Sequence, residues 1–209
     1  MKQDKPLVAI HCLVYNHEPY LRDCLEGFVM QQTNFPFVAI VHDDASTDGS
    51  AAIIREYEEK YPNIFKPIYE TENQYSKCDG SLDRIMDEAI NATGAKYVAM
   101  CEGDDYWTDP LKLQKQVDFM EANPEYSVCF HDFQIYDLRN ERWSKPIYNV
   151  NISLVDGGVD ITLEMYLRNS NYGRPLTMLF RVSNFNYQWQ KNYRYYRDTH
   201  EIYHLLCKG

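Results

Sequence analysis

The sequence predicts an α/β fold in which a mostly parallel central sheet is flanked by helices and carries a smaller antiparallel extension. Short apolar runs, typical of buried strands, alternate with segments of helical periodicity as far as residue 125. Four such alternations favour a parallel sheet, because parallel strands are joined by long crossover connections, usually helices. Beyond residue 138 the alternation ends, and shorter strand-like runs surround a turn at Gly157 and Gly158. We therefore place a boundary there, between subdomains 1–138 and 139–209.

The first two strand and helix pairs are predicted from the spacing of apolar side chains. Residues 7–14 form a short apolar run after a proline, which predicts a buried strand. Residues 18–31 carry apolar side chains at helical spacing and predict an amphipathic helix. Residues 35–41 predict the second strand, and residues 51–60 predict the helix that follows it.

The next two pairs repeat this pattern. Residues 64–69 predict a third strand, followed by a polar loop over residues 70–80. Residues 81–92 predict a helix with one apolar face. Residues 97–101 predict the fourth strand, and a helix is expected over residues 110–122 because proline is well tolerated at a first helical position.

The rest of the chain supplies a fifth strand and the antiparallel extension. Residues 126–135 predict the fifth strand. Residues 142–150 and 176–181 also have strand-like composition. One helix is expected over residues 160–168 and a last one from residue 199 onward.

The composition argues against a nucleic-acid partner. The 209 residues include 31 acidic and 21 basic side chains, a formal charge of -10, whereas a surface that follows phosphates needs a basic excess. The six cysteines form no C-x-x-C pair, which favours reduced thiols and a cytoplasmic protein. The longest apolar stretch, residues 35–41, is too short to span a bilayer.

Two acidic groups follow predicted strands. Asp43 and Asp44 come after the second strand, and Glu102, Asp104 and Asp105 come after the fourth. In open α/β sheets, ligands bind in the crevice beyond the carboxyl ends of the strands. Such residues also occur as solvated turn residues, but carboxylates gathered in one crevice repel each other, and a divalent cation compensates. The second group is therefore predicted to bind a diphosphate through Mg²⁺ or Mn²⁺, which prefer carboxylate oxygens.

Four stretches, in order along the chain, resemble the family 2 glycosyltransferases of GT-A fold. They are residues 8–17, 43–50, 94–97 and 102–105, the last of which reads E-G-D-D where the family has D-x-D-D. The resemblance covers residues 6–125. It implies an inverting transferase that moves a sugar from a nucleoside diphosphate sugar, UDP-linked in our prediction, to a saccharide or lipid-linked saccharide acceptor, with Mn²⁺ or Mg²⁺ as cofactor.

The resemblance also implies roles for individual side chains. Asp105, which closes the motif, is the implied metal ligand, and Glu102 stands where the family has its first aspartate, so its role stays open. The residues that match nucleotide-binding positions of the family are Tyr15, Asn16, Asp43, Asp44 and Asp104.

An inverting transferase needs a general base, because the acceptor hydroxyl loses its proton as it attacks the anomeric carbon. The family usually places this base in a Glu-Asp pair that opens a helix ending in glycine 11 residues later. Asp198 precedes Gly209 by that interval, although Arg197 stands where the family has glutamate. Asp198 is therefore the predicted base, a helix N-cap being the alternative role, and Glu201 is the second candidate.

Two further side chains are candidates for contact with a phosphate. His131 lies near the end of the fifth strand, and Arg84 flanks the loop over the predicted nucleotide site. A hydrogen-bonded structural histidine and a solvated arginine are the respective alternatives.

The resemblance implies different roles for the two subdomains. Residues 1–138 would bind the nucleotide sugar, and residues 139–209 would form the acceptor side. Because family members usually continue past the helix of the base, we expect a chain truncated at its C-terminus. The missing part is expected to help bind the acceptor, or to place the protein peripherally at the inner face of the cell membrane. Assembly of cell-envelope polysaccharide is the implied process.

Two other functions stay open. A noncatalytic nucleotide-sugar-binding module would keep the pocket without the base. A nucleotidyltransferase would need a basic phosphate-gripping loop after the first strand, and residues 15–20 offer none. The sequence also lacks a Walker A loop and a G-x-G-x-x-G fingerprint, so the common phosphate cradles are absent.

Overall fold

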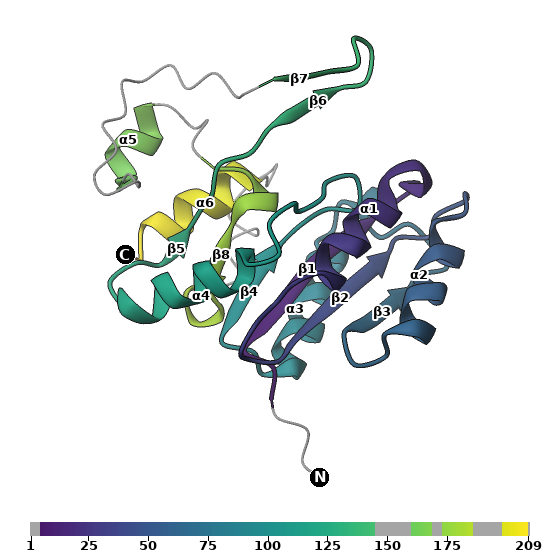
Figure 1. Cartoon of the computed structure of the whole chain (residues 1–209), viewed down its shortest axis with the longest axis horizontal. Coiled ribbons are helices and arrows are strands. Elements are labelled where there is room, and N and C mark those ends of the chain that lie inside the picture. The colour runs from purple at the N-terminus through teal and green to yellow at the C-terminus, as the bar shows by residue number, and fades with distance from the viewer. Residues whose placement is uncertain (1–4, 145–159, 169–172, 186–197, 209) are drawn as a thin grey trace.

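A six-stranded sheet forms the centre of the computed structural model, which describes residues 5–144, 160–168, 173–185 and 198–208 (Figure 1). The strand order is β3-β2-β1-β4-β8-β5. Four strands are parallel, as β1 pairs with β2 and β4 while β2 pairs with β3. These four strands are β1 (Val8–Val14), β2 (Phe37–Asp43), β3 (Phe65–Tyr69) and β4 (Tyr97–Met100).

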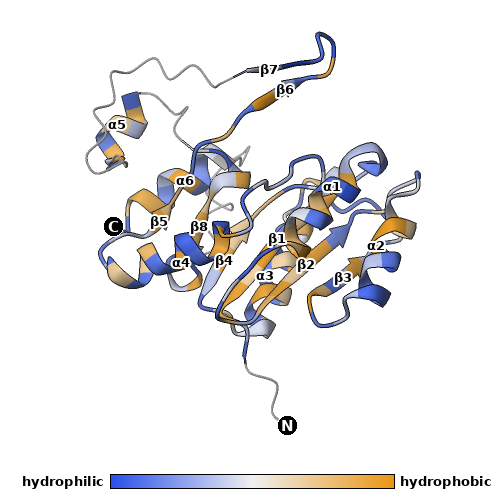
Figure 2. Ribbon diagram, in the orientation of Figure 1, coloured by the Kyte–Doolittle hydropathy of each residue, from blue (hydrophilic) through white to orange (hydrophobic). Residues whose placement is uncertain are grey.

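The helices cover both faces of this sheet. One face carries α1 (Glu18–Val29), α2 (Ser50–Lys60) and α4 (Lys112–Ala122), and the other carries α3 (Ser81–Thr93), α5 (Leu163–Arg168) and α6 (Asp198–Leu206). Successive strand residues point to opposite faces, so Val8 and Ile10 join the first core while Ala9 joins the second. The strands of the central sheet are mostly apolar, and the helices carry hydrophilic outer faces (Figure 2).

The second half of the chain contributes a strand to the central sheet. β8 (Leu179–Arg181) lies between β4 and β5 (Val128–Cys129) and runs antiparallel to both. The expected strand over residues 176–181 is therefore partly confirmed, but it pairs inside the main sheet, and Pro175–Thr177 form the 3-10 helix η2 instead. Another 3-10 helix, η3 (Val182–Asn184), follows β8.

The fifth strand is shorter than predicted. β5 ends at Cys129, and the chain then leaves the sheet toward a separate hairpin of β6 (Ile135–Asp137) and β7 (Arg142–Ser144). This hairpin projects from the body of the molecule (Figure 1). The single strand expected over residues 126–135 is therefore wrong. The turn expected at residues 157–158 and most of the strand expected over 142–150 lie outside the described residues.

Five predicted helix starts, those of α1, α2, α3, α4 and α6, agree with the structure to within two residues. α6 begins at Asp198, one residue before the predicted start. α4 begins at Lys112 rather than at Pro110, whose carbonyl oxygen accepts a hydrogen bond of 2.8 Å from the N–H of Gln32. In the described ranges, no helix has the length and apolar character needed to cross a membrane.

Candidate active site

A cavity of about 2290 Å³ lies beside the carboxyl end of β4. Its wall brings together side chains that are far apart in the sequence. Residues of the polar loop before α3, of the acidic motif after β4, of the hairpin and of α6 all contribute to it. The crevice predicted at this end of the sheet is therefore present.

The acidic motif forms one cluster on this wall. Oxygen atoms of Glu102, Asp104 and Asp105 lie within 4.8 Å of one another. Burial raises the pKa of Asp105 to about 6, and the nearby charge of Asp104 adds to this effect. Clustered and partly desolvated carboxylates favour a bound cation. An all-oxygen donor set of this kind fits Mg²⁺ or Mn²⁺.

Backbone contacts fix the motif against β1. The N–H of Cys101 donates to the carbonyl of His11 at 3.0 Å, and the N–H of Gly103 donates to that of Leu13 at 2.9 Å. A Cβ at Gly103 would lie 2.8 Å from His17 Nδ1 and 2.9 Å from a Val14 methyl group. Only glycine lets the motif approach β1 this closely.

Trp107 anchors the far end of the motif. Its ring is 4% exposed and lies 5.0 Å from that of Phe28 on α1. Its Nε1–H donates to the carbonyl of Leu176 at 3.0 Å, which ties the motif to η2. The acidic cluster is therefore held between β1 and a segment from the second half of the chain.

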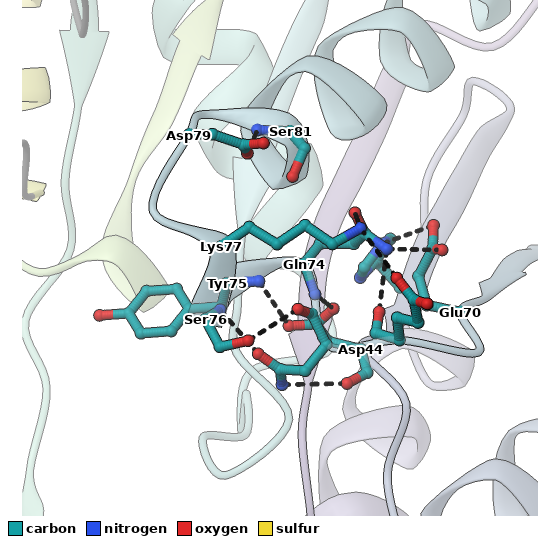
Figure 3. A network of polar contacts seen from close by, with 11 residues as sticks. Asp44, Glu70, Gln74, Tyr75, Ser76, Lys77, Asp79 and Ser81 are labelled. Carbon is teal, nitrogen blue, oxygen red and sulfur yellow. Dashed lines mark hydrogen bonds and ion pairs between the residues drawn. The ribbon is translucent and has the colours of Figure 1, made fainter.

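Asp44 is placed differently from the acidic motif. Its carboxylate is 4% exposed, does not line the cavity, and accepts the backbone N–H groups of Gln74 at 2.6 Å and Tyr75 at 3.0 Å (Figure 3). The side-chain amide of Asn73 also donates to the backbone carbonyl oxygen of Asp44 at 3.1 Å. Asp44 thus holds the loop that ends in the 3-10 helix η1 (Tyr75–Lys77), and this loop lines the cavity through Gln74 and Tyr75.

Asn16 joins two loops at the same end of the sheet. It has a left-handed backbone with φ of 56°, a conformation that asparagine adopts more readily than most residues. Its Oδ1 accepts the N–H of Thr47 at 2.8 Å, and its own N–H donates to Ser46 Oγ at 3.0 Å. Tyr15 beside it is 46% exposed. Neither residue lines the cavity, and neither does the buried Asp43.

The remaining predicted residues lie on or near the cavity. Arg84, His131 and Glu201 line it, from α3, the segment after β5, and α6. Burial lowers the pKa of His131 to about 4, so the ring is neutral at pH 7 and would not act as a phosphate-binding cation. Asp198 is the first residue of α6, one turn before Glu201, and its side chain lies outside the described part of the structure.

Two residues of the cavity wall were missed by the sequence prediction. Lys112 is 4% exposed, with its Nζ 3.8 Å from the centre of the Trp107 ring, and burial lowers its pKa to about 7. His11 is half-buried on β1, and its desolvation lowers its pKa to about 4. A lysine at the start of a helix and a histidine within a strand carry no sequence signal for such burial.

Comparison with known proteins decides the family. The model for "Glycosyl transferase family 2" matches residues 10–181. The chain belongs to this family. The match extends through β8 and includes both acidic groups.

The relatives that this chain matches are longer proteins. The uncharacterized protein Rv1520 of Mycobacterium tuberculosis is 43% identical over 128 residues, covering 61% of this chain and 35% of Rv1520. The uncharacterized glycosyltransferase MJ1057 of Methanocaldococcus jannaschii is 31% identical over 133 residues, covering 62% of this chain and 42% of that protein. The chain therefore spans well under half the length of these relatives.

Solved structures support the fold. TarS of S. aureus aligns over 96% of this chain and 33% of its own, with a TM-score of 0.62 and 17% identity. TarS 1-349 in complex with UDP-GlcNAc aligns over 84% of this chain and 45% of its own, with a TM-score of 0.56 and 18% identity. The α/β GT-A architecture of this family 2 glycosyltransferase domain is thus confirmed.

Proposed function

We propose that the chain is the nucleotide-sugar-binding catalytic domain of a metal-dependent, inverting glycosyltransferase. The observation that carries the proposal is the carboxylate cluster of Glu102, Asp104 and Asp105, which lies on the wall of a large cavity at the end of β4. In the proposal Asp105 holds Mn²⁺ or Mg²⁺. When bound, this ion supplies Lewis-acid stabilisation of the charge that builds on the departing diphosphate.

The donor is a nucleoside diphosphate sugar. Asp104, next to the metal ligand, contacts the ribose or the sugar. Asp44 acts on the nucleotide through the loop it holds, because its own carboxylate is occupied by the N–H groups of Gln74 and Tyr75. In the proposal Tyr15, Asn16 and Asp43 also contact the nucleotide, as the resemblance to the family implies, although none of them lines the cavity. The complex of TarS with UDP-GlcNAc supports testing UDP-linked sugars first.

The acceptor loses a proton as its oxygen attacks. Asp198 takes this proton from the acceptor hydroxyl, with Glu201 as the second candidate. The oxygen forms a bond to the anomeric carbon on the face opposite the diphosphate, and the bond from that carbon to the diphosphate oxygen breaks. This displacement inverts the anomeric centre. Glu201 of α6 lines the same cavity as the acidic cluster, which supports a base from the first turn of this helix.

A donor screen tests the proposal. UDP, GDP and dTDP sugars are incubated with Mn²⁺ in the absence of acceptor, and the products are separated by chromatography. We expect slow release of free sugar and nucleoside diphosphate from one nucleotide class, and its loss in Asp105→Ala. Asp118→Ala, at an exposed carboxylate on α4 outside the cavity, is the matched control.

The screen also separates the rival functions. Donor binding without hydrolysis, and without transfer to any acceptor, would favour the noncatalytic module. Cleavage within the diphosphate would favour a nucleotidyltransferase, which attacks phosphorus. Polysaccharide assembly at the inner face of the cell membrane stays a prediction.

A further inference from the structure

Three aromatic rings lie together at the rim of the cavity. Tyr106 directly follows Asp105, while Tyr136 and Trp143 are a cross-strand pair of the β6–β7 hairpin. The centre of the Trp143 ring lies 4.9 Å from that of Tyr136 and 6.5 Å from that of Tyr106. All three side chains line the cavity. The hairpin is thus joined to the acidic motif through these rings.

These rings are only partly used by the fold. Tyr106 is 37% exposed, Tyr136 42% and Trp143 54%. A two-stranded hairpin is marginally stable alone, and a cross-strand aromatic pair stabilises it. That role needs only the contact between the rings and leaves their outer surfaces open to a ligand. Aromatic surfaces at the mouth of a polar cavity are typical of ligand sites.

The charges beside the rings select the kind of ligand. Asp23 and Asp104 line the cavity close to Tyr106, whereas the cations of the same wall are Arg84, Lys112, Lys115 and Arg174. A membrane or an apolar peptide that covered the rings would bury carboxylates, at a large cost in free energy. An anionic sugar stacked on Tyr106 would be repelled by the neighbouring Asp23 and Asp104. A neutral saccharide avoids both penalties, because its C–H face packs on an aromatic ring while its hydroxyls donate hydrogen bonds to carboxylates.

We propose that Tyr106, Tyr136 and Trp143 form a platform on which a neutral saccharide acceptor stacks. The proposal rests on the proposed function, since the platform begins one residue after the predicted metal ligand. A sugar stacked there presents a hydroxyl toward the acidic cluster and the first turn of α6. The charges of Asp23 and Asp104 beside Tyr106 favour an uncharged sugar at the stacking position.

Calorimetry with defined sugars tests the platform. Maltotetraose, cellotetraose and chitotetraose are titrated into the protein with UDP and Mn²⁺ present, and tetragalacturonate serves as the anionic counterpart. We expect at least one neutral tetrasaccharide to bind and tetragalacturonate to bind more weakly. Trp143→Ala should lower the affinity for the neutral sugar about tenfold. Trp143→Phe should keep much of the wild-type affinity. UDP affinity should stay unchanged in both variants.

The control is Phe119→Ala, which removes a ring that is 41% exposed on α4 and lies outside the cavity. Equal sugar affinity in Trp143→Ala and Phe119→Ala would overturn the platform, as would binding of UDP by a protein that binds none of the neutral sugars. Sedimentation with phosphatidylcholine vesicles that depends on Trp143 would assign the rings to a membrane and also overturn it. Failure of UDP itself to bind would count against the proposed function, while Trp143-dependent sugar binding would still support the platform.

Discussion

The Asp44 carboxylate accepts a hydrogen bond of 2.6 Å from the backbone N–H of Gln74, 30 residues further along the chain. The neighbouring N–H of Tyr75 reaches the other oxygen. One buried side chain therefore fixes the loop that forms a wall of the cavity. Hydrogen bonds from backbone N–H groups to a charged carboxylate are stronger than those to a neutral acceptor.

Asp44→Asn should loosen this loop. An amide offers one acceptor oxygen in place of two, so one backbone N–H loses its partner and local opening becomes easier by about 1–3 kcal/mol. Hydrogen exchange at the amides of Gln74 and Tyr75 should accelerate, and UDP affinity should fall. Asp118→Asn, on exposed α4, is the control. Unchanged exchange in Asp44→Asn would show that the loop does not depend on this carboxylate.

Mn²⁺ binding should weaken below a pH of about 6. Burial raises the pKa of Asp105 to about 6, and a proton on this carboxyl competes with the metal ion. Electron paramagnetic resonance of free Mn²⁺, recorded on both sides of this pH, measures the affinity. Asp105→Asn should bind Mn²⁺ weakly and without this pH dependence. A wild-type affinity that stays constant across this range would contradict the role of Asp105.

The carboxyl of Asp105 should lower the free energy of unfolding of the metal-free protein near neutral pH. Burial raises its pKa in the folded protein above the ordinary value of 3.8, so its stabilising contribution is full below pH 3.8 and is lost as the pH rises through about 6. Asp105→Asn should therefore raise the melting temperature above wild type near neutral pH, by roughly 2–4 °C. The difference should shrink in acid. Thermal unfolding followed by circular dichroism measures both.

Asp198→Asn should lower the transfer rate by about 10²- to 10⁴-fold while leaving UDP affinity unchanged. The amide cannot take the proton of the acceptor hydroxyl, and the donor contacts lie elsewhere. Glu201→Gln, one turn later on α6, provides the comparison. If Glu201→Gln loses the larger share of the rate, the base is Glu201 and not Asp198.

Lys112 should make the stability rise with pH. Burial lowers its pKa from 10.5 to about 7, so between these values the unfolded chain binds more protons than the folded one, and stability increases as the pH rises. Lys112→Met keeps the apolar stem and should remove this slope. Lys115→Met, at an exposed residue paired with Asp109, is the control. Melting curves at several pH values give the slopes; equal slopes in wild type and Lys112→Met would exclude this effect.

The first half of the fold could be predicted because its signals are local. The four parallel strands alternate with amphipathic helices, and each apolar run marks an element that packs in one of two cores. The acidic motif follows β4 directly, so its place at the end of the sheet follows from the strand.

Other features depend on contacts that the local sequence does not carry. β8 joins the sheet between β4 and β5, although it comes about 50 residues after β5 in the sequence. β5 itself ends after two residues. The partners of Asp44 come from a loop 30 and 31 residues away. Likewise, the burial of Lys112 depends on Trp107, whose ring is fixed by η2 from the far end of the chain.

The central claim is that Asp105 joins a metal ion to the diphosphate of the donor. Calorimetric titration of UDP with Mn²⁺, and again with a chelator in place of Mn²⁺, tests it most directly. We predict binding by wild type and by Asp118→Ala only when Mn²⁺ is present, and at least about tenfold weaker binding by Asp105→Ala. UDP affinity that is the same in Asp105→Ala as in wild type, or that is insensitive to the chelator, would contradict the claim.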